Sequence, residues 1–368
     1  MKYRRMPIEV ESPEQLGYDS IKYNLAESSM NDVLFKDLRF NLDKVILCYG
    51  HHIGKPELRK LIVSESKPLN ENHVLLTASA AAGLFIVNTS LLEKNDHLIV
   101  VRPNYATNIE TPRAIGCNID FAELKIEEKF KLDINKIKKL IKPSTKLISI
   151  TTPHNPTGVM LSEKELKELI KLAESKNIFL LVDETYRDLS FIAPPPIAAS
   201  MSKNVISISS VSKAYGLPGI RLGWIMCKNE KLMEIFLAAK EQIYICNSVV
   251  DEEIAYLFLK NKKQYFKKTE KRKQENFQVL KKWLHNQDFL EYVLPQGGVV
   301  CFPKIKKRIN VERFYKILND KYSTYVGPGH WFEMDKNYFR IGFGWPDSKE
   351  LEQGLYNITK AFHETIGS

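Results

Sequence analysis

Four short polar segments carry side chains that could act together in one reaction. They are Asn155–Gly158, Asp183–Tyr186, Ser209–Lys213 and the stretch around Arg340. Each alone has an ordinary explanation, because Asn-Pro-Thr-Gly favours a turn and an aspartate at a strand end is often a helix cap. Together they supply a carboxylate, a phenol, an amine and a guanidinium. This set suits the binding of a phosphorylated pyridine aldehyde.

The elements that position these segments are predicted from apolar runs. Five short, β-branched runs are typical of strands buried on both faces of a mostly parallel sheet. Between two of them, Ser162 and Glu165 form a capping box that begins a helix ending near Lys176. This order predicts βαβ units and a doubly wound α/β core, which binds ligands at the carboxyl ends of its strands. The runs are His97–Val101, Lys146–Thr152, Ile178–Asp183, Val205–Ser209 and Leu222–Cys227.

The pattern changes after Ser248, where shorter and more polar elements follow. We predict a large domain over residues 44–249, with a sheet of the seven-stranded type. A smaller α+β domain is predicted from residues 1–43 and 250–368. Its elements are a long helix over 251–286, a strand near Val299–Phe302, a helix near Val311–Lys321, a strand at Tyr338–Phe343 and a last helix from Ser348.

The composition is that of an ordinary folded protein, with 368 residues, 44% apolar and 27% charged. The five cysteines are scattered and never spaced C-x-x-C, which argues against a disulfide framework or zinc ribbon and favours the cytoplasm. We expect no signal peptide, no metal site and no membrane partner. The uncharged run Val74–Leu92 predicts a buried strand, a turn and a buried helix, because it holds many small and polar residues. The excess of basic residues between Lys260 and Lys282 is interpreted as a solvated helix face, not a nucleic-acid site.

In this order and spacing, the segments resemble the class I/II aminotransferases, which use pyridoxal 5'-phosphate (PLP). The resemblance covers essentially the whole chain. It implies that Lys213 forms the Schiff base with PLP and that Asp183 keeps the pyridine nitrogen protonated. It further implies that Tyr186 and Asn155 bind the hydroxyl oxygen of the ring.

The resemblance also implies a phosphate site. Arg221 and Ser210 match phosphate ligands of the family, and Ser79-Ala80-Ala81 matches an amide turn at a helix N-terminus. Alanine occupies two positions of this turn where the family often has glycine or a hydroxyl, so we expect one side-chain contact to be missing. Tyr105 matches the aromatic residue that stacks on the cofactor ring.

Two further residues carry implications for assembly and substrate. Tyr49 resembles the residue that reaches the phosphate of the neighbouring subunit, which implies a homodimer with shared active sites. Arg340 resembles the clamp for the substrate α-carboxylate, a task that suits a planar guanidinium. The implied reaction moves the amino group of an L-amino acid to a 2-oxo acid, with the freed amine of Lys213 as general base.

The nature of the substrate side chain stays open. Glu27 and Asp188 would suit a cationic side chain such as that of arginine if both face the pocket; otherwise they are solvated surface acids. His330 follows a Gly-Pro-Gly turn and either lines the pocket mouth or lies in a loop.

The fate of the substrate carbanion is also open. The same cofactor site could support elimination, cyclisation or oxidation of an arginine-like substrate. A PLP-binding regulator without turnover is a second alternative. It is disfavoured because the resemblance begins near the N-terminus and leaves no room for a preceding DNA-binding module.

Overall fold

The computed structural model describes residues 1–367 and has a seven-stranded sheet at its centre. In chain order its strands are β2 (Val74–Thr77), β3 (His97–Arg102), β4 (Asn118–Glu123), β5 (Thr145–Thr151), β6 (Phe179–Asp183), β7 (Val205–Ser210) and β8 (Gly223–Cys227). In space the order is β2-β8-β7-β6-β5-β3-β4. Within this sheet, β8 runs antiparallel to the other strands, which are parallel to one another. We call this the large sheet.

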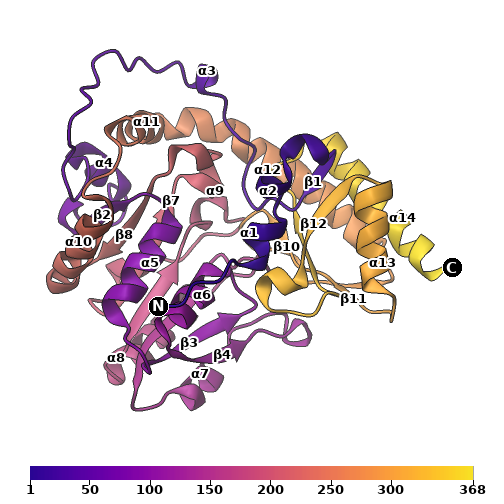
Figure 1. Cartoon of the computed structure of the whole chain (residues 1–368), viewed down its shortest axis with the longest axis horizontal. Helices are drawn as coiled ribbons and strands as arrows, with labels where there is room; N and C mark the ends of the chain where they lie inside the picture. Colours follow the sequence, from indigo (N-terminus) through magenta and orange to yellow (C-terminus); the bar gives the residue numbers. More distant parts are fainter. Residues whose placement is uncertain (368) are drawn as a thin grey trace.

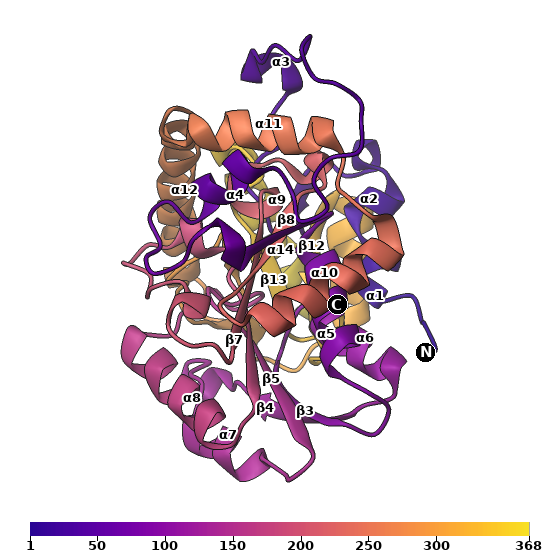
Figure 2. The ribbon, with the colours of Figure 1, turned by 90° about the vertical axis from the view of Figure 1, so that its left-hand side faces the viewer.

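Helices cover both faces of the large sheet. They are α5 (Ala80–Leu91), α6 (Thr107–Ile115), α7 (Ile134–Leu140), α8 (Glu163–Ser175) and α10 (Glu230–Tyr244). Figure 2 shows α7 and α8 on one side of the strands and α5 and α6 on the other. Successive side chains of a strand point to opposite faces, so Leu180 and Val182 of β6 join the core under α8, whereas Leu181 joins the core under α5 and α10. The predicted doubly wound α/β fold is confirmed.

The predicted strands occur within one residue of their expected bounds, and the run at 74–92 forms β2 and α5. Sequence patterns did not indicate β4. This strand lies at the edge of the sheet, and Ala122 is its one buried residue. An edge strand with a half-exposed, polar sequence lacks the continuous apolar run that identified the others.

A second, four-stranded sheet contains β1 (Tyr23–Leu25), β10 (Val300–Cys301), β12 (Thr324–Pro328) and β13 (Phe339–Gly342), in the order β1-β12-β13-β10. We call this the small sheet. Its strand β1 pairs in parallel with β12, so the N-terminal segment lies beside the C-terminal part of the chain. The remaining strands, β9 (Leu290–Glu291) and β11 (Lys304–Ile305), form a separate antiparallel pair.

The long helix predicted over 251–286 is wrong as a single element. It is two helices, α11 (Val249–Lys260) and α12 (Lys262–His285), separated at Asn261. The Asn261 side-chain amide donates to the carbonyl of Leu257, which satisfies a free carbonyl at the end of α11. Beyond them, α13 (Val311–Lys316) continues as a π-helical turn, and α14 (Ser348–Ile366) packs beside α12 (Figure 1).

The N-terminal segment contains α1 (Pro7–Glu11), α2 (Pro13–Leu16), α3 (Phe35–Leu38) and, after a long connection, α4 (Pro56–Ile62). Figure 1 shows that the chain around α3 projects away from the rest of the molecule. In the connection, Ile46 is 76% exposed and Leu47 is 82% exposed. Among residues 1–367, no helix has both the length and the apolar character needed to cross a bilayer.

Candidate active site

A cavity of about 220 Å³ lies at the carboxyl ends of the central strands, next to the small sheet. The topology explains its place, because β5, β6 and β7 are adjacent and parallel, and the segment after each of them enters the cavity. It is lined by twelve of the fourteen residues predicted from sequence: Glu27, Ser79, Ala80, Ala81, Tyr105, Asn155, Asp183, Tyr186, Ser210, Lys213, Arg221 and Arg340.

Asp183 is the last residue of β6 and is almost fully buried. Its Oδ1 accepts hydrogen bonds from the backbone N–H of Thr185 at 3.0 Å and from Thr185 Oγ1 at 2.6 Å. Burial raises the pKa of Asp183, although both hydrogen bonds oppose this change. A protonated nitrogen placed against this carboxylate would favour its charged form.

Lys213 lies in the short helix α9 (Ser212–Tyr215), which follows β7. Its carbonyl accepts from the N–H of Met30 at 2.9 Å, which fastens α9 to the N-terminal segment. Burial alone would lower the pKa of Lys213, but Tyr186, Glu27 and Tyr105 favour its charged form, and the pKa lies above its ordinary value. The amine is therefore held among acidic groups inside the cavity.

Arg340 reaches the cavity from β13 of the small sheet and is 3% exposed. Its Nη1 donates to Asn155 Oδ1 at 3.0 Å, and its Nη2 donates to the carbonyl of Ala26 at 2.6 Å. Among residues 1–367, its buried Nε finds no hydrogen-bond partner. Both partners are neutral, and burial lowers the pKa of Arg340. A buried cation in this state would gain from an anion in the cavity.

The backbone at Glu27 packs closely against β13, which places Ala26 and Glu27 near Arg340. A Cβ on Gly342 would lie 1.6 Å from the carbonyl oxygen of Glu27, so only glycine lets the N-terminal segment cross β13 here. Glu27 is buried and accepts a hydrogen bond from the hydroxyl of Tyr18 at 3.2 Å. Burial raises the pKa of Glu27, and the positive charges of Lys213 and Arg340 oppose this change.

The N-terminus of α5 also lines the cavity. Ser79 caps this helix, because its Oγ accepts from the N–H of Ala82 at 3.0 Å. A Cβ on Gly223 would lie 2.6 Å from the backbone nitrogen of Ala80, so glycine in β8 is needed for this turn to pack closely. Free N–H groups at a helix N-terminus favour an anion such as a phosphate.

Ser210 and Arg221 also line the cavity. Ser210 is buried at the end of β7, and its Oγ accepts from the N–H of Ser212 at 3.3 Å. Arg221 is exposed, and its Nη1 donates to the carbonyl of Pro218 at 2.8 Å. Its φ of 42° is in the left-handed region, which a residue other than glycine seldom adopts.

Two predicted residues are not brought to this cavity. Asp188 lines an adjoining cavity of about 750 Å³, where it pairs with Lys262 and accepts from the hydroxyl of Tyr215. Its negative charge is therefore already paired, and the structure contradicts the prediction that it faces the pocket with Glu27. Tyr49 is 81% exposed on the projecting connection.

Sequence reasoning missed the contribution of α1 and α2. Glu9 and Glu14 are exposed acids that line the mouth of the cavity, and Trp331 lines it from the C-terminal side. No periodicity or motif marks these N-terminal acids, so their sequence carries no signal for the site. His330 does not line the cavity; it contacts Glu11 instead.

Known proteins share this sequence pattern and fold. The family "Aminotransferase class I and II" matches residues 22–358. The chain is 25% identical to capreomycidine synthase of Streptomyces vinaceus, over 93% of this chain and 90% of that protein. It is 28% identical to an aspartate aminotransferase of Pyrococcus horikoshii, over 87% and 84%. A PLP-dependent aminotransferase structure from Streptococcus suis superposes with a TM-score of 0.92 at 27% identity, covering 99% of each chain. The chain therefore belongs to the class I and II aminotransferase family of PLP-dependent enzymes.

Proposed function

We propose that this protein transfers the amino group of an L-amino acid to a 2-oxo acid. The observation that carries the proposal is a single cavity that contains a half-buried amine from Lys213, a buried carboxylate from Asp183 and a buried guanidinium from Arg340. Among residues 1–367, the hydrogen bonds of this guanidinium go only to neutral oxygens. An amino acid and a 2-oxo acid share the α-carboxylate that such a guanidinium binds. Relatives that are aminotransferases support the same reaction.

The lining of the cavity fits PLP. The helix N-terminus at Ser79 and the side chains of Ser210 and Arg221 suit its phosphate, and Asp183 suits its ring nitrogen. Asn155 and Tyr186 lie on the same lining and suit its ring oxygen. When bound, PLP supplies an electron sink for the charge that develops on the substrate α-carbon.

The chain's own groups divide the remaining tasks. Lys213 Nζ would attach the cofactor at rest and, once free, would remove and return the proton of the substrate α-carbon. Arg340 would orient the substrate through its carboxylate, and Asn155 already holds the guanidinium in place. Asp183 and Arg340 are buried, and a charged contact is stronger in such a low-dielectric setting than in water.

A second candidate function is another fate of the same carbanion on a cationic amino acid. It is favoured by the acids of the cavity, since Glu27 lies inside it and Glu9 and Glu14 lie at its mouth. A guanidinium or ammonium group on the substrate would complement them. Similarity to capreomycidine synthase supports this candidate, which includes cyclisation or oxidation of an arginine-like substrate.

We further propose a homodimer with shared active sites. The projecting connection exposes Ile46, Leu47 and Tyr49, and α3 exposes Phe35. Large apolar side chains gathered on one extended segment favour burial against a partner. A second copy of the chain, which would receive Tyr49 near its phosphate site, is the occupant that we propose.

A screen of amino donors tests the reaction. The purified PLP-loaded protein would be mixed with each L-amino acid, and the cofactor absorbance recorded before and after addition of 2-oxoglutarate. Transamination predicts conversion to the amino form of the cofactor and its reversal by the 2-oxo acid. Ammonia release, oxygen uptake or a cyclised product would favour the second candidate. Borohydride reduction followed by peptide mass mapping should place the cofactor on Lys213; attachment to another lysine would contradict the assignment.

A further inference from the structure

Helix α1 lines the active-site cavity although it has little apolar anchorage. Ile8 and Glu9 of this helix face the cavity, yet no residue of α1 is buried. Ile8 is half-buried against the core that contains Trp331. Before the helix, the N–H of Lys2 donates to the carbonyl of Ala114 at 2.9 Å. Ser12 and Pro13 are buried directly after the helix, but α1 itself has little apolar burial, so polar contacts contribute to its position.

Glu11, at the end of α1, makes two such contacts with the turn η8 (Gly329–Phe332). Its Oε2 accepts from Trp331 Nε1 at 2.8 Å and lies 2.8 Å from His330 Nε2. The Trp331 side chain is buried and lines the cavity, and a buried indole N–H needs an acceptor. Glu11 supplies this acceptor from a helix that also lines the cavity.

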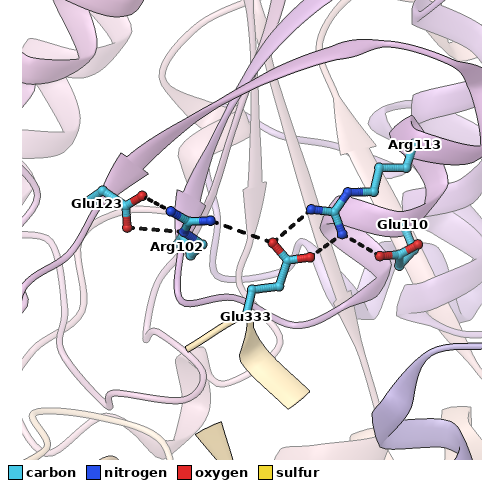
Figure 3. A network of polar contacts seen from close by, with 5 residues as sticks. All are labelled: Arg102, Glu110, Arg113, Glu123 and Glu333. Carbon is cyan, nitrogen blue, oxygen red and sulfur yellow. Dashed lines mark hydrogen bonds and ion pairs between the residues drawn. The ribbon is translucent and has the colours of Figure 1, made fainter. Parts of the chain in front are cut away.

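The turn that holds Glu11 is itself fixed to the large sheet. Figure 3 shows Glu333, the residue after η8, between Arg113 of α6 and Arg102 of β3. Arg113 Nη2 donates to Glu333 Oε2 at 2.9 Å, and Nη1 donates to the other oxygen. Glu110 and Glu123 pair with the same two arginines. Ion pairs thus attach the η8 turn to β3 and α6, and Glu11 connects α1 to this turn.

We propose that Glu11 is a positioning residue for the substrate pocket. By holding α1 on the η8 turn, it keeps Ile8 and Glu9 at the cavity mouth, where they close the pocket around the substrate. Glu11 itself does not line the cavity. The proposal rests on the proposed function in one respect, that an amino acid binds in this cavity.

Hydrogen exchange of the PLP-loaded protein tests the position of α1 without measuring activity. In Glu11→Ala, amides of residues 6–17 should exchange about tenfold faster than in the wild type, because one charge-assisted contact and the acceptor of Trp331 are lost. Glu11→Gln should lie between the two, since its amide oxygen can still accept from Trp331. Asp19→Asn, a change at an exposed acid outside the cavity, is the matched control and should match the wild type. Unchanged exchange in Glu11→Ala would overturn the proposal.

Kinetics with L-arginine and L-aspartate separate positioning from general destabilisation. Glu11→Ala should raise KM for the reacting amino acid about tenfold with a smaller change in kcat, and leave the cofactor absorbance unchanged. Faster exchange that extends through residues 100–250, or loss of the cofactor, would show a structural role and overturn the proposal. If neither amino acid reacts with the wild type, these two are not substrates, and the exchange experiment still decides the role of Glu11.

Discussion

Arg340→Ala should lower kcat/KM for amino acids by at least about 100-fold, because the wild-type guanidinium forms no salt bridge within residues 1–367 and can bind the substrate carboxylate. It is 3% exposed, and its hydrogen bonds go to Asn155 Oδ1 at 3.0 Å and to the carbonyl of Ala26 at 2.6 Å. Within residues 1–367, no carboxylate forms a salt bridge with it, although the charge of Glu27 in the same cavity favours its charged form. A structural ion pair therefore does not account for its burial. The substrate carboxylate would supply the missing charge.

The expected loss of kcat/KM follows from the number of hydrogen bonds that the guanidinium can donate to the substrate carboxylate. A hydrogen bond to a charged group contributes about 1.5–3 kcal/mol, so two bonds to a carboxylate contribute about 3–6 kcal/mol, and about 1.4 kcal/mol corresponds to a factor of ten. The free energy of unfolding of Arg340→Ala should change by less than the transition-state free energy does. Loss of the guanidinium leaves the acceptors of Asn155 and Ala26 unpaired, at about 1–3 kcal/mol each, while removal of an unpaired buried charge offsets part of this cost.

The assay compares kcat/KM for an amino acid and for its decarboxylated amine in wild type, Arg340→Ala and Arg340→Lys. The kcat/KM for the amine should differ little between wild type and the variants, since the amine lacks the carboxylate. Arg340→Lys should recover only part of the kcat/KM lost in Arg340→Ala, because an ammonium group lacks the planar, two-pronged geometry of a guanidinium. Arg313→Ala, at an exposed arginine of α13, is the control. Normal KM values for every amino acid in Arg340→Ala, or unfolding of that variant, would refute the reasoning.

Three further expectations concern the cofactor site, the pH dependence of stability and assembly. Asp183→Asn should slow exchange of the substrate α-proton at least about 100-fold, since an electrostatic contact of this kind contributes about 3 kcal/mol or more. Asp188→Asn is the control. An exchange rate equal to that of the wild type in Asp183→Asn would contradict the proposed contact of Asp183 with the ring nitrogen. Burial raises the pKa of Glu184 from 4.5 to about 6, so the folded state keeps a proton that the unfolded chain has released. The free energy of unfolding should therefore fall by about 2 kcal/mol as the pH rises through this interval, and Glu184→Gln should lack this decrease in urea titrations while the exposed Glu234→Gln keeps it. Ile46→Ser with Leu47→Ser should shift the sedimentation coefficient towards the monomer, whereas Ile192→Ser should not; a wild type that sediments as a monomer would contradict the homodimer.

The strands, and the polar residues at or after their ends, were predictable because apolar runs and short motifs in the nearby sequence mark them. A strand buried on both faces needs a continuous apolar run. Asp183 ends such a run, and Asn155 and Lys213 follow others within a few residues. Parallel order then brings them to one edge of the sheet. The same reasoning failed for β4, whose edge position requires no such run, and for the interruption at Asn261, where one side-chain hydrogen bond ends a helix in an otherwise helical pattern.

The sequence by itself therefore determined the α/β fold and identified twelve residues that line the cavity, since each depends on periodicity or on a short motif. The tertiary structure alone decided which of the predicted side chains reach the cavity and what they contact. It pairs Asp188 with Lys262, gives Arg340 two neutral partners and brings α1 to η8 through Glu11 and Trp331. These contacts join residues from 74 to 320 positions apart in the chain. Such pairs leave no local pattern, because their proximity depends on how the two sheets and the N-terminal segment pack together.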